Sequence, residues 1–195
     1  MRCERTPRGW FGPVLVAATL LVPGVPLAQE RGWKTDAATS RLGFAATVEK
    51  SAVPGVFKEF EARVYLDSKR PGASRLDVTV VMKSADMNDS EVNGTIRGAE
   101  WFDVVRFPRA EFHATDIQQT AAGRYVARGT LRLKGVQQPV EVPFNWVQSD
   151  DAAQMDGELI IRRGAFGIGT GEWAATTLVG PDVKVGFSLR LRRDG

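Results

Sequence analysis

The sequence predicts an all-β protein of about eight antiparallel strands with one short helix. Two observations carry this prediction. Apolar and polar residues alternate with a period of two along many segments, and one segment has helical spacing instead. Each alternating segment has one apolar and one polar face, whereas the strands of a doubly wound α/β sheet are apolar on both sides. The chain therefore builds a sheet with one wet face and one buried face.

The first 28 residues have the order of an export signal. Three arginines precede the apolar run Val14–Val22, and a Pro/Gly-containing stretch then ends at Ala28. The run is about half of the ~20 residues that a membrane-spanning helix needs, so we expect cleavage and no stable transmembrane anchor. Residues 29–195 then form one domain that is periplasmic or secreted.

The composition excludes several classes of function. Removal of the first 28 of the 195 residues leaves 167 and lowers the formal net charge from +3 to +1. No stripe of lysine and arginine remains of the kind that binds nucleic acid. The only cysteine, Cys3, lies in the predicted signal, so the exported form has no disulfide, no thiolate metal site and no cysteine nucleophile. Its stability must come from packing.

Alternation places the strands along the chain. Each segment puts apolar side chains on one face, as Val183, Val185 and Phe187 do opposite Lys184 and Ser188. The weaker candidates are about 110–116 and 155–162. The clear strands are 42–48, 60–66, 76–82, 124–134, 140–146 and 182–192.

The segment between Asn88 and Phe102 interrupts this rhythm. Val92, Ile96 and Ala99 recur at helical spacing, and Asp89 or Ser90 is suited to the N-cap. The spacing predicts one short helix, which we expect to close or plug an opening.

Eight amphipathic strands can bury their apolar faces in a sandwich or in a closed barrel, and alternation alone does not decide between them. A barrel of about eight strands is either filled by its own side chains or wide enough for one small ligand. Closure also removes the exposed edges on which strands of other chains could pair.

A catalytic constellation is not evident. The only histidine, His113, lies on a polar strand face, where a solvated side chain is expected, and without cysteines it cannot build the usual zinc site. Asp86, Asp89 and Glu91 are better explained as capping and solvating the helix than as catalytic acids. The glycine run 164–171 lacks the Lys-Ser/Thr pair of a phosphate loop and predicts tight turning before the last strand. No catalytic residue, metal site or cofactor is predicted.

The ordered motifs resemble those of the YceI-like proteins, over about residues 33–192. Each motif is short, and their order and spacing make the resemblance specific. The motifs are Trp33-Lys-Thr-Asp36 with Ser40-Arg-Leu-Gly-Phe44, Val56-Phe-Lys-Glu-Phe60, Gly98-Ala-Glu-Trp-Phe-Asp103, Phe107-Pro-Arg-Ala-Glu-Phe112, Gly129-Thr-Leu-Arg-Leu-Lys-Gly-Val136 with Pro139-Val140, Arg163-Gly-Ala-Phe-Gly-Ile-Gly169, and the closing Val183-x-Val-x-Phe187.

This resemblance implies an extended, lipocalin-like eight-stranded antiparallel barrel that holds a polyisoprenoid or related amphiphilic lipid in an apolar tunnel. The sequence departs from the family pattern at Val53–Val56, Asn93–Arg97 and Gly169–Trp173, near the expected tunnel ends, and this puts the lipid head group in doubt. The expected wall residues are Phe44, Phe60, Val64, Val78, Phe112, Leu131, Leu133, Phe144, Trp146, Phe187 and Leu189, with Phe102 and Phe166 bordering an opening.

The leading hypothesis is an exported protein that sequesters or carries an isoprenoid-type lipid, with an isoprenoid quinone as one candidate. Two alternatives stay open. One is a ligand-free envelope or stress interaction module with a filled barrel, and the other is a hydrolase or isomerase that acts on a lipid through Asp86, Asp89 or Glu91. The sequence also leaves a homodimer open.

Overall fold

The computed structural model describes residues 32–67 and 73–194, so the predicted signal at 1–28 lies outside the described residues. This part of the chain contains eleven strands and one α-helix, α1 (Ser90–Arg97), with short 3-10 turns η2 (Met82–Ser84), η3 (Arg163–Phe166) and η4 (Gly171–Ala174). None of its helices is long and apolar enough to cross a membrane. The strands are β1 (Trp33–Thr35), β2 (Arg41–Val48), β3 (Ser51–Phe57), β4 (Phe60–Tyr65), β5 (Arg75–Val81), β6 (Ala85–Asp86), β7 (Arg109–Ala121), β8 (Arg124–Leu133), β9 (Val136–Gln148), β10 (Ala152–Arg162) and β11 (Val179–Arg193).

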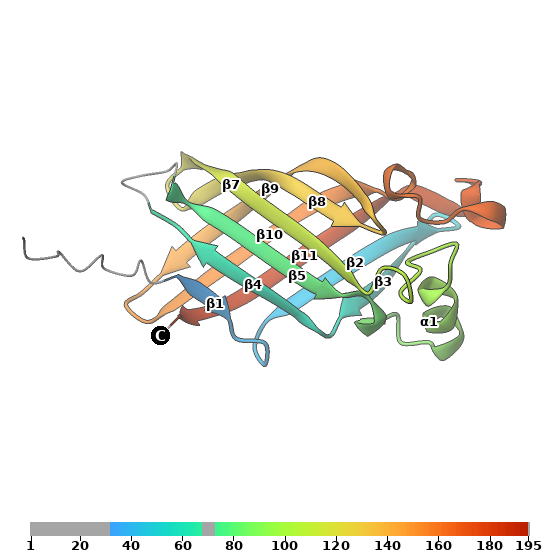
Figure 1. The fold of residues 1–195 in the computed structure, drawn as a ribbon, viewed down its shortest axis with the longest axis horizontal. Helices are drawn as coiled ribbons and strands as arrows, with labels where there is room; N and C mark the ends of the chain where they lie inside the picture. Colours follow the sequence, from blue (N-terminus) through green and yellow to red (C-terminus); the bar gives the residue numbers. More distant parts are fainter. Residues whose placement is uncertain (1–31, 68–72, 195) are drawn as a thin grey trace, which may run out of the picture.

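The strands form one closed antiparallel barrel with eight strand positions (Figure 1). β1 and β2 share one position because both pair with β11, and β3 and β4 share the next because they pair with β2 and β1. The remaining positions follow chain order from β5 through β7, β8, β9 and β10 to β11. β1 pairs with both β4 and β11, which seals the sheet and excludes the sandwich alternative.

The eight predicted strands are confirmed, and the strongly alternating ones keep their predicted faces. In β7, for example, Ala110, Phe112 and Ala114 are buried while Glu111 and His113 are exposed. The sequence did not predict β1, β3 or β6. β3 was missed because Pro54 and Gly55 interrupt its alternation, and β1 and β6 are too short to show a period.

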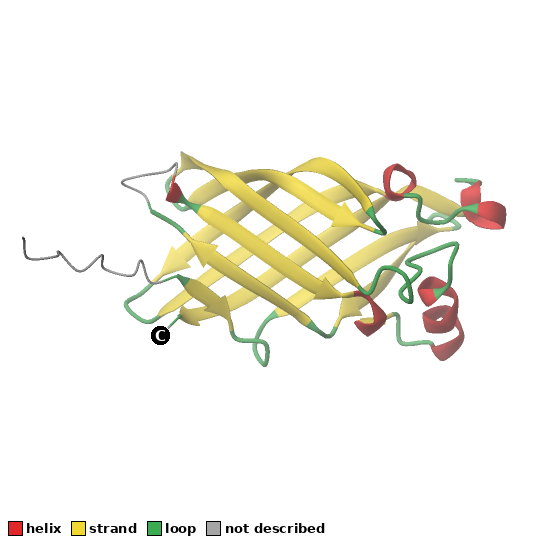
Figure 2. Cartoon of the chain, in the orientation of Figure 1, coloured by secondary structure: helices red, strands yellow, loops and turns green. Residues whose placement is uncertain are grey.

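The predicted helix is confirmed and lies beyond one end of the barrel (Figure 2). Asp89 is its N-cap, and the carboxylate accepts hydrogen bonds from the main-chain N–H groups of Glu91 (2.9 Å) and Val92 (3.0 Å). The apolar face is narrower than the spacing predicted, because only Ile96 is buried while Val92 and Ala99 are exposed.

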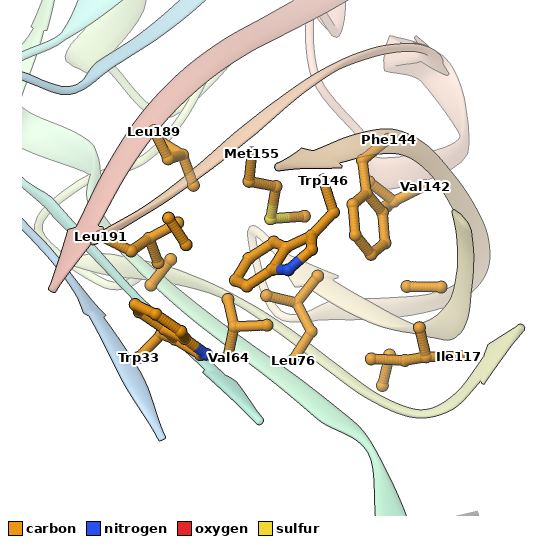
Figure 3. Packing of buried hydrophobic residues seen from close by; sticks show 14 of the residues in the cluster. Trp33, Val64, Leu76, Ile117, Val142, Phe144, Trp146, Met155, Leu189 and Leu191 are labelled. Atoms are coloured by element: carbon orange, nitrogen blue, oxygen red, sulfur yellow. The ribbon is translucent and has the colours of Figure 1, made fainter. Parts of the chain in front are cut away.

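The opposite end of the barrel, where β1 meets the end of β11, is packed solid. Trp33 and Trp146 meet edge to face with ring centroids 5.8 Å apart. Figure 3 shows them among other buried side chains of this cluster, including Val64, Leu76 and Met155, each of which is 1% exposed. The indole Nε1 of Trp146 donates to Gln148 Oε1 at 2.8 Å, which satisfies its one polar atom. We call this region the packed end, and the opposite one the α1 end.

Candidate functional site: an apolar lumen

Between the packed end and the α1 end lies a cavity of about 180 Å³, which we call the lumen. Its walls are the inward faces of the barrel strands, and side chains of the neighbouring turns and loops border it toward the α1 end. The lining residues are Leu42, Phe44, Phe57, Phe60, Leu76, Val78, Val80, Met82, Phe102, Ala110, Glu111, Phe112, Leu131, Leu133, Val140, Val142, Met155, Leu159, Ile161, Arg163, Ile168, Val183, Val185, Phe187 and Leu189.

Several inward side chains around the lumen are less buried than those at the packed end. Val78, Leu131 and Phe187 point inward and yet are only half-buried, whereas Ala62 and Val64 at the packed end are 0% and 1% exposed. Complete packing would bury all five equally. The interior is therefore filled at the packed end and leaves a hollow beside these half-buried side chains.

Only two of the lining residues are charged, and neither offers a charge to the lumen. Glu111 is exposed and alternates with the inward Ala110 and Phe112, so its carboxylate lies on the outer face of β7. Arg163 is 3% exposed, and all of its N–H groups are engaged elsewhere.

Arg163 fastens the loop between β10 and β11, residues 163–178, which lies at the α1 end and which we call the crossing segment. Its Nε donates to the carbonyl of Gly180 at 3.0 Å, and Nη1 and Nη2 donate to four further carbonyls at 2.8–3.0 Å, those of Ile168, Gly169, Trp173 and Val179. A guanidinium has five N–H donors, so none is left for a ligand. None of the ion pairs among the described residues includes Arg163, and burial lowers the pKa of its guanidinium.

Two further contacts hold this crossing segment in place. The carbonyl of Glu100, in the loop after α1, accepts from the main-chain N–H groups of Gly169 (2.8 Å) and Thr170 (3.1 Å). Lys134 Nζ, from the β8–β9 turn, donates to the carbonyl of Gly167 at 2.7 Å. Tight turning is possible because Gly167, Gly169 and Gly171 have φ values of +64°, +70° and +61°, so the glycine run is a backbone device, as predicted.

A row of phenylalanines borders the lumen at the α1 end. The rings of Phe44 and Phe57 have centroids 4.9 Å apart, and Phe57 and Phe102 follow at 6.2 Å. Phe44 comes from β2, Phe57 from β3 and Phe102 from the loop after α1. Three separate elements thus converge to form an aromatic rim.

Nine of the thirteen wall residues named from the sequence line the lumen, and four do not. Val64, Phe144 and Trp146 belong to the packed end, and Phe166 is buried in a second cluster with Met82 and Leu133. The nine that line it are Phe44, Phe60, Val78, Phe102, Phe112, Leu131, Leu133, Phe187 and Leu189. All thirteen are inward or buried apolar positions, and alternation cannot say at which level of a barrel the packing stops.

Sequence reasoning did not name several lining residues. Most of them, such as Leu42, Val80 and Val142, lie on faces whose alternation was visible, and this signal could have included them. Phe57 follows the interrupted pattern of β3, and Ile168 lies in the glycine run, so neither carries a periodic signal.

The polar residues considered for chemistry lie outside the lumen. Asp86 accepts from Lys58 Nζ (2.5 Å), Asn93 Nδ2 (2.8 Å) and the main-chain N–H of Asn88 (2.9 Å), and these bonds hold the pKa of its carboxyl far below the usual range. His113 is exposed on β7 and contacts Asp77 on β5. Within the described part of the chain, no group of three or more acidic, histidine or cysteine side chains could hold a metal ion.

Comparisons with known proteins agree with this architecture. The crystal structure of BcnA from Burkholderia cenocepacia superposes with a TM-score of 0.77 at 31% identity, and the match covers 80% of this chain and 98% of that one. A polyisoprenoid binding domain from Saccharophagus degradans superposes with a TM-score of 0.68 at 16% identity, covering 83% of this chain and 98% of that one, which shows a shared fold.

Curated relatives match part of the chain. A UPF0312 protein of Enterobacter sp. (strain 638) is 34% identical over 98 residues, half of each chain, and protein YceI of Salmonella arizonae is 34% identical over 98 residues, 50% of this chain and 51% of that one. A UPF0312 protein of Shewanella sp. (strain W3-18-1) is 30% identical over 129 residues, 66% of this chain and 68% of that one. The YceI-like domain model matches residues 33–191, and this chain therefore belongs to the YceI-like domain family.

Proposed function

We propose that this protein is an exported carrier that sequesters an isoprenoid-type lipid, with the lipid's hydrocarbon tail in the lumen. The observation that carries the proposal is a lumen of about 180 Å³ whose accessible side chains are apolar. Enclosing a few hundred Å² of hydrocarbon contributes on the order of 5–10 kcal/mol before association costs, at about 25 cal/mol per Å². The polyisoprenoid binding domain with the same fold supports this class of ligand.

The tail, and not the head group, selects the ligand in this proposal. The two charged lining residues offer the lumen no polar partner, because Glu111 lies on the outer face of β7 and carbonyls take up all five donors of Arg163. A polar head group placed inside would lose its hydrogen bonds to water without replacement. It therefore stays at the α1 end, beyond the aromatic rim, and an isoprenoid quinone with a compact ring is one candidate.

The alternatives have less support. A filled barrel would not leave half-buried side chains such as Val78 and Leu131 around a cavity. For the enzyme alternative, Asp89 is occupied as the helix cap and Asp86 is held ionised by three hydrogen-bonding partners, while neither they nor Glu91 line the lumen. No observation on the described residues favours lipid turnover.

Native mass spectrometry tests the proposal. Protein purified from the periplasm without added lipid is analysed directly, and then after incubation with farnesol, geranylgeraniol or a short-chain ubiquinone. We expect a lipid adduct in at least one of these samples, and the same spectra report the oligomeric state. Protein that carries no lipid and takes up none of the three probes would refute the proposal.

A lumen-filling variant locates the bound tail. Leu133 is 8% exposed and lines the lumen, so Leu133→Trp should abolish uptake by filling space, at a stability cost of about 1–3 kcal/mol. Val147 is 68% exposed on the outside of β9, and Val147→Trp is the matched control that should bind normally. Unchanged uptake by a folded Leu133→Trp protein would place the lipid elsewhere.

A further inference from the structure

Two lumen phenylalanines each face a glycine on a neighbouring strand. Phe44 on β2 is directly opposite Gly55 on β3, and Phe187 on β11 is directly opposite Gly157 on β10. All four positions point inward, so a side chain at either glycine would enter the space that a ring now occupies. The same arrangement at two places in the wall suggests a common purpose.

At Gly55 the contact involves the ring alone. A Cβ atom built on Gly55 would lie 2.8 Å from both Cε atoms of Phe44 and closer still to Cζ, and these are its three nearest neighbours. Gly55 does not have the positive φ that requires glycine, so the backbone would accept alanine. The ring of Phe44 is what excludes a side chain here.

The neighbours of Phe44 explain the direction of its tilt. On the other side of β2, Val185 of β11 is directly opposite Phe44 and presents a branched side chain. With a glycine on one flank and a valine on the other, the ring leans over Gly55 and lies along the wall. A Cβ at position 55 would block this side too, and the ring would then stand perpendicular to the sheet, in the lumen.

Gly157 faces the ring of Phe187 in the same way, but at this position a main-chain atom also limits the space for a side chain. A Cβ there would lie 3.0 Å from Cε1 of Phe187 and closer to its Cζ, but also 2.5 Å from the main-chain oxygen of Pro143. Alanine at 157 would therefore disturb the β9–β10 pairing as well as the ring. Gly55 is the position at which the effect on the lumen can be isolated.

We propose that Gly55 is a specificity-determining residue: by letting the Phe44 ring lie against the wall, it keeps the lumen open near the α1 end for a long or bulky tail. This inference rests on the proposed lipid-carrier function. Phe44 also contacts Phe57 in the aromatic rim, so its displacement would narrow the passage between the rim and the interior. Lumen width is thus set by the absence of a side chain on β3.

The test compares Gly55→Ala with a matched control and a rescue variant. Gly186→Ala is the control, because Gly186 is also in the barrel wall and a Cβ there would meet nothing within 4 Å. Uptake of geraniol, farnesol and geranylgeraniol is measured for each protein by native mass spectrometry, and the Phe44 ring is located in a crystal structure of Gly55→Ala. Gly55→Ala/Phe44→Leu removes the displaced ring and should recover uptake.

We expect Gly55→Ala to bind geranylgeraniol about tenfold more weakly or worse, the scale on which pocket shape discriminates between ligands. The ring should have moved into the lumen, and the Gly186→Ala control should bind normally. Uptake by Gly55→Ala equal to that of the wild type, or a Phe44 ring still against the wall, overturns the inference. Wild-type protein that binds none of the probes speaks against the carrier function instead, and the crystal structure still decides the ring's position.

A folding failure also gives a decision. If Gly55→Ala does not fold, the inference requires that Gly55→Ala/Phe44→Leu folds, because the clash has been removed. A double variant that also fails to fold would show that Gly55 serves the backbone of β3 and not the ring, which overturns the inference.

Discussion

Removing the same two methyl groups from Val64 and from Val78 should have unequal costs. Val64 is 1% exposed in the packed end, and Val78, which lies inward on the adjacent β5, is half-buried on the lumen wall. Both are inward β-branched residues of barrel strands, so Val64→Ala and Val78→Ala are matched in chemistry and in backbone setting. They differ in whether other atoms fill the space beyond the side chain.

The expected magnitudes follow from burial. At about 0.8 kcal/mol per buried methyl-sized group, Val64→Ala loses about 1.6 kcal/mol of transfer free energy, and the new cavity raises the cost to about 2–3 kcal/mol. Val78→Ala enlarges a space that already exists and loses a side chain that is partly accessible. We expect it to lower the free energy of unfolding by about 1 kcal/mol or less.

Urea unfolding of lipid-free protein, followed by tryptophan fluorescence, measures both costs from the midpoint, provided that the m value is unchanged. Equal losses for the two variants would refute the division into a packed end and a hollow lumen. Saturating geranylgeraniol adds a second comparison. A ligand that contacts Val78 stabilises the wild type more than Val78→Ala, whereas Val64→Ala should be stabilised as much as the wild type.

Two further predictions concern the α1 end. Arg163→Lys should lower the free energy of unfolding by about 3 kcal/mol in urea titrations. The three ammonium donors leave at least two of the five carbonyls without a charge-assisted hydrogen bond, each worth roughly 1.5 kcal/mol. An unchanged free energy of unfolding in Arg163→Lys would show that the crossing segment does not depend on these hydrogen bonds. The folded pKa of Asp86 is below its unfolded value, so its contribution is complete above about pH 4 and is lost as the pH falls toward the folded pKa. Asp86→Asn should therefore flatten the acid side of a urea-midpoint-versus-pH profile, and an unchanged profile would contradict this assignment.

The sequence predicted the secondary structure well because most strands have one wet face. Where that contrast was missing, as in β3 with Pro54 and Gly55, the strand was not predicted. The residues that line the lumen were harder to predict, for a different reason. Phe144 and Phe187 have the same alternating signature, yet one is 4% exposed in the packed end and the other borders the lumen. Which one a ligand can reach depends on how side chains from distant strands meet.

The role of Arg163, a polar residue, was also not predictable from the sequence. Its place in a family motif was visible, but its burial and its five carbonyl partners were not, because those partners are main-chain atoms of residues that carry no polar side-chain signal. The helix cap was easier, since Asp89 and the N–H groups that it binds are local in sequence.

The pairing of β1 and β2 with β11 has a consequence for biosynthesis. The seam joins residues such as Asp36 and Arg192, which are separated by 156 positions, so it cannot form until nearly the whole chain has emerged. Up to that moment the growing sheet has two bare edges and an uncovered oily surface, the combination that promotes aggregation. A chain truncated before β11 would keep those unpaired edges. We infer that cellular quality control would encounter it as an open sheet that is prone to aggregate.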